Sequence, residues 1–136
     1  ITPVMKNRKL HGVSLLFYFP GKIDWLPARF AVGASIPSER NDGGIDGYHC
    51  WAEFYAEGKW WPIDISEGNK YTALATYYFG HHPANRIEFS RGRDLQVEPG
   101  PSSGAINFLA YPVLEINRQV IPTKTTFSFK RSDPPA

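Results

Sequence analysis

The strongest constraint on the fold of this chain is a pair of strand-like runs in mid-sequence that are joined by a tight turn signal. The runs cover residues 48–56 and 59–65, and Glu57-Gly58 separates them. Glycine tolerates the positive φ that two-residue hairpin turns require. The segment therefore predicts an antiparallel hairpin. Side chains alternate along a strand, so one face of the first run carries polar and aromatic residues, namely His49, Trp51 and Glu53.

The register of this hairpin decides where Asp64 lies. A two-residue loop pairs Ala56 with Lys59, which places Asp64 opposite Trp51 and on the same face as His49. Diagonal neighbours of this kind lie roughly 7–8 Å apart at Cα, close enough for a carboxylate to reach an imidazole. A three-residue loop would instead turn Asp64 to the other face, so this contact depends on the loop length.

A carboxylate bonded to one imidazole nitrogen fixes the tautomer, and the other nitrogen can then activate a nucleophile. Spacing alone leaves open the alternative that His49 and Asp64 are ordinary half-buried polar residues. Cys50 is adjacent to His49, so its thiol points to the opposite face and is expected to be a buried core group. That face carries the small or apolar residues Tyr48, Cys50, Ala52 and Phe54.

Composition excludes several classes of function. The 136 residues suit one domain, and 15 basic against 13 acidic side chains give a net charge of +2, which provides no electrostatic reason to expect nucleic acid as a partner. No apolar run reaches the roughly 18 residues of a membrane span. The single cysteine excludes an internal disulfide and a multi-cysteine metal site. We expect no metal and no cofactor, and the sequence leaves the compartment and the oligomeric state open.

Scattered glycine and proline residues favour short strands joined by turns. We expect a mainly antiparallel sheet and one short helix over 71–78, capped by Ser66 or Asn69. The other strand-like runs cover 28–34, 86–90, 106–116 and 125–130.

Several linked motifs resemble the bacterial transglutaminase-like superfamily. The string His49-Cys50-Trp51-Ala52-Glu53, followed by Trp61 and Asp64, is similar to the family's H-x-W-x-E and W-x-x-D motifs. Leu26-Pro27-Ala28-Arg29-Phe30 resembles the "I-P-A-R" start of the sheet. Further similar strings, Tyr77-Tyr78-Phe79-Gly80 and Ile87 to Asp94, extend the resemblance to about residue 117.

The resemblance implies an α+β, papain-like fold with a Cys-His-Asp triad. It implies that His49 is the base, that Asp64 orients it, and that Trp51 and Glu53 border the substrate cleft. The implied activity is thiol acyl transfer, or amide or peptide hydrolysis, on a protein or peptide substrate.

The nucleophile of that triad is missing from the sequence. The family places its cysteine at the start of a helix about 17 residues before the Pro of "I-P-A-R", and the matching position here is Leu10. Read one base out of register, codons compatible with residues 10–25 can encode C-T-E-F-H-S-F-F-I-S-L-A-R-S-I-G, which resembles the nucleophile helix. We hypothesise a compensated frame error or a sequencing artefact, and we expect the helix to be disrupted and the chain to be inactive or marginally stable.

The expected organisation follows from these points. Residues 1–25 are an aberrant segment of a chain truncated at its N-terminus and are loosely packed, residues 26–130 form the transglutaminase-like core sheet, and residues 131–136 are a tail. Because the nucleophile is absent, a non-catalytic module that binds peptide or glycan in the same cleft remains the alternative function.

Overall fold

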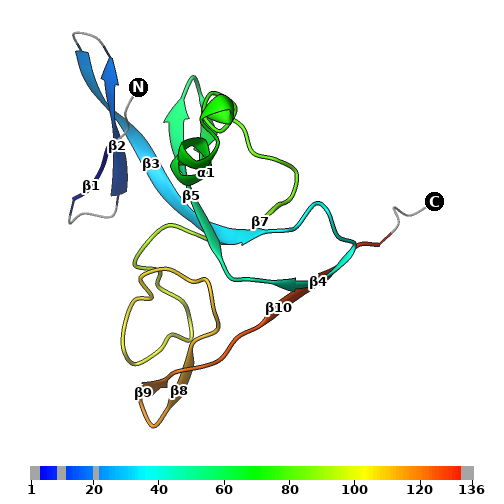
Figure 1. Cartoon of the computed structure of the whole chain (residues 1–136). Coiled ribbons are helices and arrows are strands. Elements are labelled where there is room, and N and C mark those ends of the chain that lie inside the picture. Colours follow the sequence, from blue (N-terminus) through cyan, green and yellow to red (C-terminus); the bar gives the residue numbers. More distant parts are fainter. Residues whose placement is uncertain (1–3, 9–11, 20–21, 133–136) are drawn as a thin grey trace.

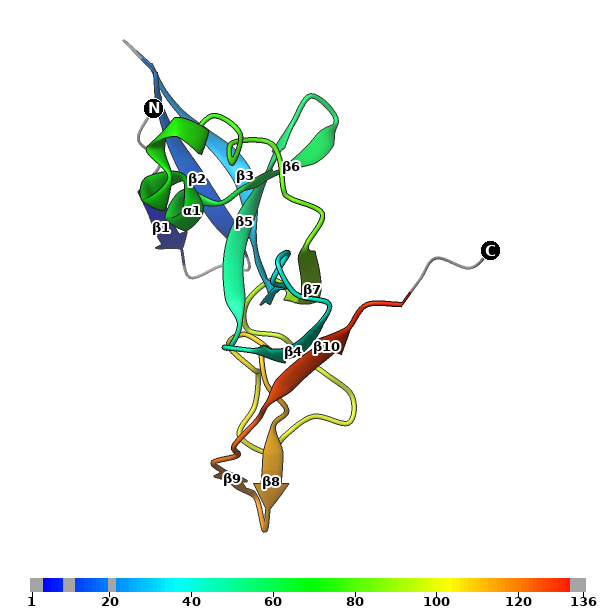
Figure 2. The ribbon, with the colours of Figure 1, turned by 45° about the vertical axis from the view of Figure 1, so that its right-hand side comes forward.

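A computed structural model of the chain describes the backbone of residues 4–8, 12–19 and 22–132, and the side chains of residues 26–132. Within these residues the protein is mostly antiparallel β-sheet with few helices. The main sheet and the helical segment occupy one part of the molecule (Figure 1). Figure 2 shows the hairpin β8–β9 at the opposite end of the molecule from α1.

The main sheet has six strands in its described part, ordered β1-β2-β3-β5-β6, and β7 pairs with β3. All of its pairings are antiparallel. The strands are β1 (Val4–Arg8), β2 (Gly12–Phe19), β3 (Lys22–Ser35), β5 (His49–Ala56), β6 (Lys59–Ile63) and β7 (Arg86–Arg91). Two small sheets follow, which pair β4 (Asp42–Ile45) with β10 (Phe127–Lys130) and β8 (Leu114–Ile116) with β9 (Gln119–Ile121).

The predicted central hairpin is present in the predicted register. Ala56 pairs with Lys59 across the turn, and Ala52 pairs with Ile63 further along the ladder. Both turn residues, Glu57 and Gly58, have positive φ, at 53° and 77°. Two successive positive φ values are the signature of a type I′ turn, whose twist matches that of the flanking strands. The hairpin therefore presents alternate side chains as the sequence indicates.

The helix begins earlier than predicted. α1 (Ile65–Lys70) is followed by the 3-10 turn η1 (Thr72–Leu74), so the expectation of a helix over 71–78 is wrong. Asp64 is the N-cap, because its side chain accepts a hydrogen bond from the backbone N–H of Glu67. This cap also ends β6 at Ile63, two residues before the predicted end of that strand.

The strand predicted over 106–116 is also largely absent. Ile106 forms only an isolated bridge to Leu95, and regular pairing begins at Leu114. Pro112 has no N–H to donate to a ladder, which explains why the run does not continue as one strand. The shorter strands over 28–34, 86–90 and 125–130 are present in large part as β3, β7 and β10.

The segment before residue 26 contributes strands. β2 pairs with the first half of β3 from Phe19↔Lys22 to Val13↔Ala28, and β1 pairs with β2. β3 runs without a break through residues 25 and 26. The side chains of residues 1–25 lie outside the described part of the chain, and so does the expectation that they are loosely packed. Residues 133–136 of the predicted tail lie outside it as well.

The core forms on the face of the hairpin that carries Ala52. A buried cluster of Ala28, Ala52, Phe54 and Ile63 lies between β3, β5 and β6. Trp61, Ile65 and Phe79 pack against it, so α1 and the turn after it cover this face. Full burial of a side chain such as Phe54 stabilises a fold by about 2 kcal/mol. Across the described residues, no helix has the length and apolar character needed to cross a membrane.

Candidate functional site

His49 and Asp64 meet at the edge of the main sheet. His49 is the first residue of β5, and Asp64 directly follows β6. The Nε2 atom of His49 lies 2.5 Å from Oδ2 of Asp64. The side chain of His49 is 19% exposed, whereas that of Asp64 is 1% exposed. The predicted contact between the imidazole and the carboxylate is therefore present, with Asp64 buried and His49 partly exposed to solvent.

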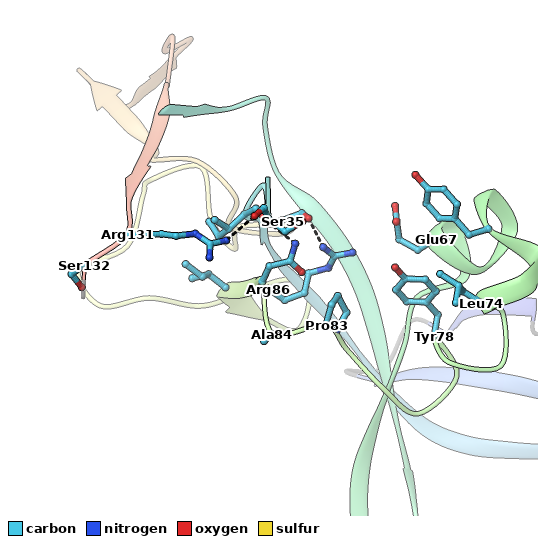
Figure 3. Close-up of a pocket in the computed structure, with 14 residues that line it drawn as sticks. Ser35, Glu67, Leu74, Tyr78, Pro83, Ala84, Arg86, Arg131 and Ser132 are labelled. Carbon is cyan, nitrogen blue, oxygen red and sulfur yellow. Dashed lines mark hydrogen bonds between the residues drawn. The ribbon is translucent and has the colours of Figure 1, made fainter. Parts of the chain in front are cut away.

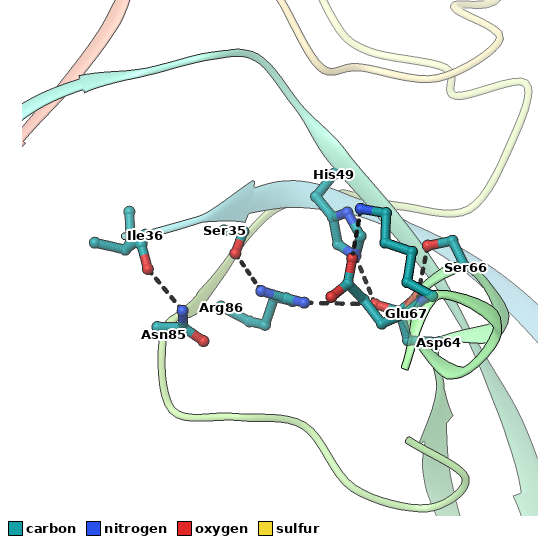
Figure 4. Close-up of polar contacts among 9 residues, drawn as sticks. Ser35, Ile36, His49, Asp64, Ser66, Glu67, Asn85 and Arg86 are labelled. Atoms are coloured by element: carbon teal, nitrogen blue, oxygen red, sulfur yellow. Dashed lines mark hydrogen bonds and ion pairs between the residues drawn. The ribbon is translucent and has the colours of Figure 1, made fainter. Parts of the chain in front are cut away.

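Hydrogen bonds to both carboxylate oxygens fix the orientation of the Asp64 side chain. Its Oδ1 accepts hydrogen bonds from the hydroxyl of Ser66 at 2.8 Å and from the N–H of Glu67 at 3.0 Å, while Oδ2 faces His49 (Figure 4). Burial raises the pKa of this carboxyl, but the hydrogen bonds from His49, Glu67 and Ser66 outweigh it and bring the pKa down to about 2. Asp64 is therefore an anion throughout the neutral range.

Arg86 is a third member of this site that the sequence did not indicate. Its Nη2 lies 3.6 Å from Oδ2 of Asp64, and its Nη1 donates to the hydroxyl of Ser35 (Figure 4). The side chain of Arg86 is only 6% exposed. It comes from the first residue of β7, and only the pairing of β7 with β3 places it beside Asp64. The spacing of Arg86 from His49 and Asp64 in the sequence does not predict this contact.

The helix cap, by contrast, had a signal in the sequence. Asp64 and Glu67 have the spacing of a capping motif, in which a polar residue is followed three positions later by an acidic one. This signal places the start of the helix at Ile65, where the structure has it. The same carboxylate that orients His49 therefore also starts α1.

Trp51 shares the face of His49, as predicted, and is buried to 5% exposure. Its ring lies over Gly33, where an added Cβ would come within 2.8 Å of the Trp51 Cη2 atom. The His82 ring contacts the Trp51 indole edge-on, with ring centroids 4.9 Å apart. The His49 ring stacks with the same indole, with centroids 6.3 Å apart. Trp51 is thus a buried ring that packs against the imidazole of His49.

His82 is half-buried beside Trp51. Burial lowers its pKa, and the positive charge of Arg86 lowers it further. The His82 ring lies in the loop before β7 and packs on Trp51.

Glu53, the other predicted cleft residue, is engaged by two cations. Its Oε2 accepts a hydrogen bond from Nε of Arg29 at 2.5 Å and lies 3.7 Å from Nε of Arg91. The guanidinium of Arg29 also stacks on the Trp60 ring at 4.0 Å. Glu53 therefore joins β5 to β3 and β7 through charge.

Cys50 lies on the other face of the hairpin. It lines a hollow of about 370 Å³ whose walls include the core residues Ala52 and Ile63 and the first turn of α1. Burial raises the pKa of its thiol, against the opposing effect of Arg93. The thiol is therefore a poor nucleophile, and alternation along β5 directs it to the face opposite His49. Cys50 is half-buried, so the expectation that it is a buried core residue is wrong.

The described residues contain no group of three or more His, Cys, Asp or Glu side chains arranged to hold a metal ion. The site thus consists of a buried carboxylate, an imidazole at the rim and a guanidinium behind them, and it can orient an imidazole for proton transfer. Comparisons with protein-family models, with curated proteins and with solved structures find no match for the chain.

Proposed function

We propose that the chain carries the His–Asp half of a thiol-dependent acyl-transfer site that acts on protein or peptide amides, on a transglutaminase-like, papain-like fold. The observation that supports this most is the 2.5 Å contact between Nε2 of His49 and Oδ2 of a buried Asp64. Among the described residues, Nδ1 of His49 has no hydrogen-bond partner. It is therefore the nitrogen available to exchange a proton with a nucleophile.

The chemistry follows from this arrangement. A thiol gives its proton to Nδ1 of His49 and its sulfur attacks the carbonyl carbon of an amide, and Asp64 stabilises the imidazolium that results. The imidazolium then returns the proton to the leaving nitrogen, the C–N bond breaks, and an acyl thioester remains. Water completes hydrolysis of the thioester, or an amine completes transfer.

Cys50 is not used as the thiol in this proposal, because it follows His49 directly on β5 and side chains alternate between the two faces of a strand. In this proposal the nucleophile belongs to the helix that the shifted reading frame of residues 10–25 encodes. The chain as written then binds substrate amides without turning them over.

The test is a variant in which residues 10–25 are replaced by C-T-E-F-H-S-F-F-I-S-L-A-R-S-I-G. It should release ammonia from a glutamine-containing peptide or cleave a peptide amide, while the chain as written does neither. His49→Ala in the restored variant should lower the rate by roughly 10²–10⁴-fold, because the general base is lost. Activity of the restored variant that survives this substitution unchanged would refute the role of His49.

A second candidate is a non-catalytic module that binds peptide or glycan. The sequence favours it, because its single cysteine, Cys50, adjoins His49 on β5 and so projects to the opposite face. Binding of a peptide or an oligosaccharide by the chain as written, together with an inactive restored variant, would select this function. Turnover by the restored variant would exclude it.

A further inference from the structure

β7 forms one edge of the main sheet in the described part of the chain. It pairs with β3 and with no other described strand. At its start, the N–H of Ile36 donates to the carbonyl of Asn85 at 2.8 Å. At its end, the N–H of Gly92 donates to the carbonyl of Phe30 at 2.7 Å. Both ends of β7 are therefore held against β3, and its other edge has no described strand beside it.

These two hydrogen bonds decide which main-chain groups of β7 face away from β3. Successive residues of a strand direct their N–H and C=O groups to opposite edges. Phe89 is the extra residue where the β3–β7 register shifts, so the count runs separately from each end. It places the main-chain groups of Arg86, Glu88 and Arg91 on the outer edge. No hydrogen bond among the described residues uses these outward groups.

Solvent reaches the main chain at this outer edge. Glu88 is exposed as a whole residue although only 30% of its side chain is exposed, so its main chain contributes to the exposure. Arg86 is half-buried as a whole residue although its side chain is only 6% exposed, so part of its exposure also comes from the main chain. A ligand that approaches the outer edge can therefore contact the main chain of β7.

The side chains of β7 do little to keep another strand away. Unpaired charges and proline are common guards of an open sheet edge. In β7 the exposed charges neutralise each other, because Nη2 of Arg91 lies 2.8 Å from Oε2 of Glu88. The strand contains no proline, and its Ile87 and Phe89 side chains are exposed. The edge thus offers main-chain groups together with apolar side chains.

A cavity of about 930 Å³ lies at the start of this edge (Figure 3). Residues 83–87, which lead into β7, line it on one side, and the helical segment lines it on the other. Its volume is within the range of ligand pockets, about 300–1,000 Å³. A strand that lies along β7 and continues past Arg86 runs beside residues 83–85 and can place a side chain there. The apolar and aromatic residues of the lining are Ile36, Tyr71, Leu74, Tyr78, Pro83 and Ile87.

We propose that the outer edge of β7 binds an extended peptide segment, which adds a strand to the main sheet and places one large apolar side chain in this cavity. In such complexes main-chain hydrogen bonds give affinity, and a pocket for a side chain gives specificity. Binding at β7 requires neither the His–Asp dyad nor a thiol. The inference therefore goes beyond the proposed function and does not rest on it.

A second copy of the chain, paired antiparallel through its own β7, fits this edge less well. The residues after Arg91 of the copy would then lie beside the cavity. Gly92 has no side chain to fill it, and Oδ1 of Asn107 holds the guanidinium of Arg93, at 2.9 Å from Nε and 2.6 Å from Nη2. The copy thus brings no free apolar side chain to the cavity, whereas a peptide of suitable sequence does.

The experiment is a titration of the full chain with the peptide acetyl-Thr-Val-Phe-Val-Thr-amide, followed by two-dimensional NMR of the backbone amides of the protein. Resonances of residues 86–91 should move, and the amides of Arg86, Glu88 and Arg91 should gain protection from hydrogen exchange. Replacement of the phenylalanine of the peptide by alanine should weaken binding by about tenfold, because the cavity is no longer filled.

Two N-methylated versions of the peptide distinguish strand addition from apolar contact alone. Methylation of the first, third and fifth nitrogens blocks one edge of the peptide, and methylation of the second and fourth blocks the other. An added strand uses one edge only. One version should therefore keep its binding, and the other should bind at least about tenfold more weakly.

A matched pair of protein variants tests the edge itself. Glu88→Pro removes an outward N–H, and proline is tolerated on an edge strand where the N–H faces solvent. This variant should bind the peptide at least about tenfold more weakly. Glu88→Gln removes the same charge but keeps the N–H, so it should bind as the parent does. Thermal unfolding verifies that both variants are folded, and if Glu88→Pro does not fold, the N-methylated peptides decide.

Four results would overturn the proposal. They are no movement of residues 86–91 at the solubility limit of the peptide, equal binding of the two N-methylated versions, parent-like binding by folded Glu88→Pro, and a dimer in analytical ultracentrifugation that Glu88→Pro abolishes. The last result would assign the edge to a second copy. None of these measurements needs turnover, so their failure is separate from a failure of the acyl-transfer proposal, which His49→Ala in the restored variant tests.

Discussion

The Nε2 atom of His49 and the Oδ2 atom of Asp64 lie 2.5 Å apart although 15 positions separate the two residues in the chain. The two-residue turn at Glu57 and Gly58 brings them together, because it fixes the register of β5 against β6. The same carboxylate caps α1 through its other oxygen. One buried side chain therefore ends a strand, starts a helix and orients an imidazole, so its removal should affect stability and the site together.

Acid should destabilise the protein through Asp64. Its pKa is lowered from 3.8 to about 2 in the fold, so the carboxylate stabilises the folded state above its ordinary pKa and loses this contribution as the pH falls toward 2. The shift corresponds to about 2 kcal/mol. Urea unfolding at neutral pH and near pH 2 should show Asp64→Asn less stable than the parent at neutral pH, by about 2 kcal/mol, and less sensitive to acid.

The matched control for this experiment is Asp46→Asn, which changes an exposed aspartate. It should keep the acid dependence of the parent protein. An Asp64→Asn protein with the same loss of stability in acid as the parent would contradict the assignment.

Gly33→Ala should be strongly destabilising. A Cβ at this position would come within 1.9 Å of the carbonyl oxygen of Ile87 and within 2.8 Å of the Trp51 ring, and a backbone atom cannot move aside as a flexible side chain can. We expect a loss of about 3 kcal/mol or more in the free energy of unfolding, measured by thermal or urea denaturation.

Gly44→Ala is the control for Gly33→Ala, since the nearest atom to a Cβ at Gly44 is the carbonyl oxygen of Phe127 at 3.8 Å. If both variants unfold at the same midpoint, the close approach of β7 and Trp51 to Gly33 is not what fixes this position.

Glu57→Asn should stabilise the hairpin. Glu57 has a φ of 53°, which asparagine adopts more readily than glutamate, and Asn-Gly is a favoured pair in type I′ turns. The free energy of unfolding should rise by roughly 0.5–1 kcal/mol. Glu57→Gln, which removes the same charge without the conformational preference, should leave stability unchanged; a gain of equal size in the glutamine variant would assign the effect to charge.

Cys50 should react slowly with iodoacetamide, and independently of His49. Burial raises the pKa of its thiol, so the thiolate fraction at about pH 8 is lower than in an unfolded peptide. Mass spectrometry of timed samples gives the rate, with the urea-unfolded chain as reference. His49→Ala should not change the rate in the folded protein. A marked slowing in that variant would mean that the imidazole activates Cys50.

The sequence alone was sufficient for the hairpin. A turn dipeptide and strict alternation in the flanking runs predicted the pairing of Ala56 with Lys59, the position of Asp64 on the His49 face and the separation of Cys50 from it. The capping spacing from Asp64 to Glu67 was also present, although the helix was predicted too late in the chain. These features are local, because each depends on residues within a few positions or on one tight turn.

Local sequence patterns gave wrong predictions where contacts between distant segments determine the secondary structure. The run over 106–116 has strand composition, but only its end, Leu114–Ile116, pairs with another strand. Among the described residues, the part before Pro112 has one isolated bridge, from Ile106 to Leu95. That part therefore remains in loop structure, because a strand needs a neighbour to satisfy its backbone hydrogen bonds.

The sequence by itself determined which side chains share a face of the hairpin, since alternation and turn length are properties of the local backbone. Only the tertiary structure decided that Arg86 lies behind Asp64 and that Trp51 is buried over Gly33. Ser35 and Arg86 are 51 positions apart and meet because β7 pairs with β3. Such a contact depends on which strands associate across long loops, and the balance of burial and hydrogen bonding over the whole sheet decides that association.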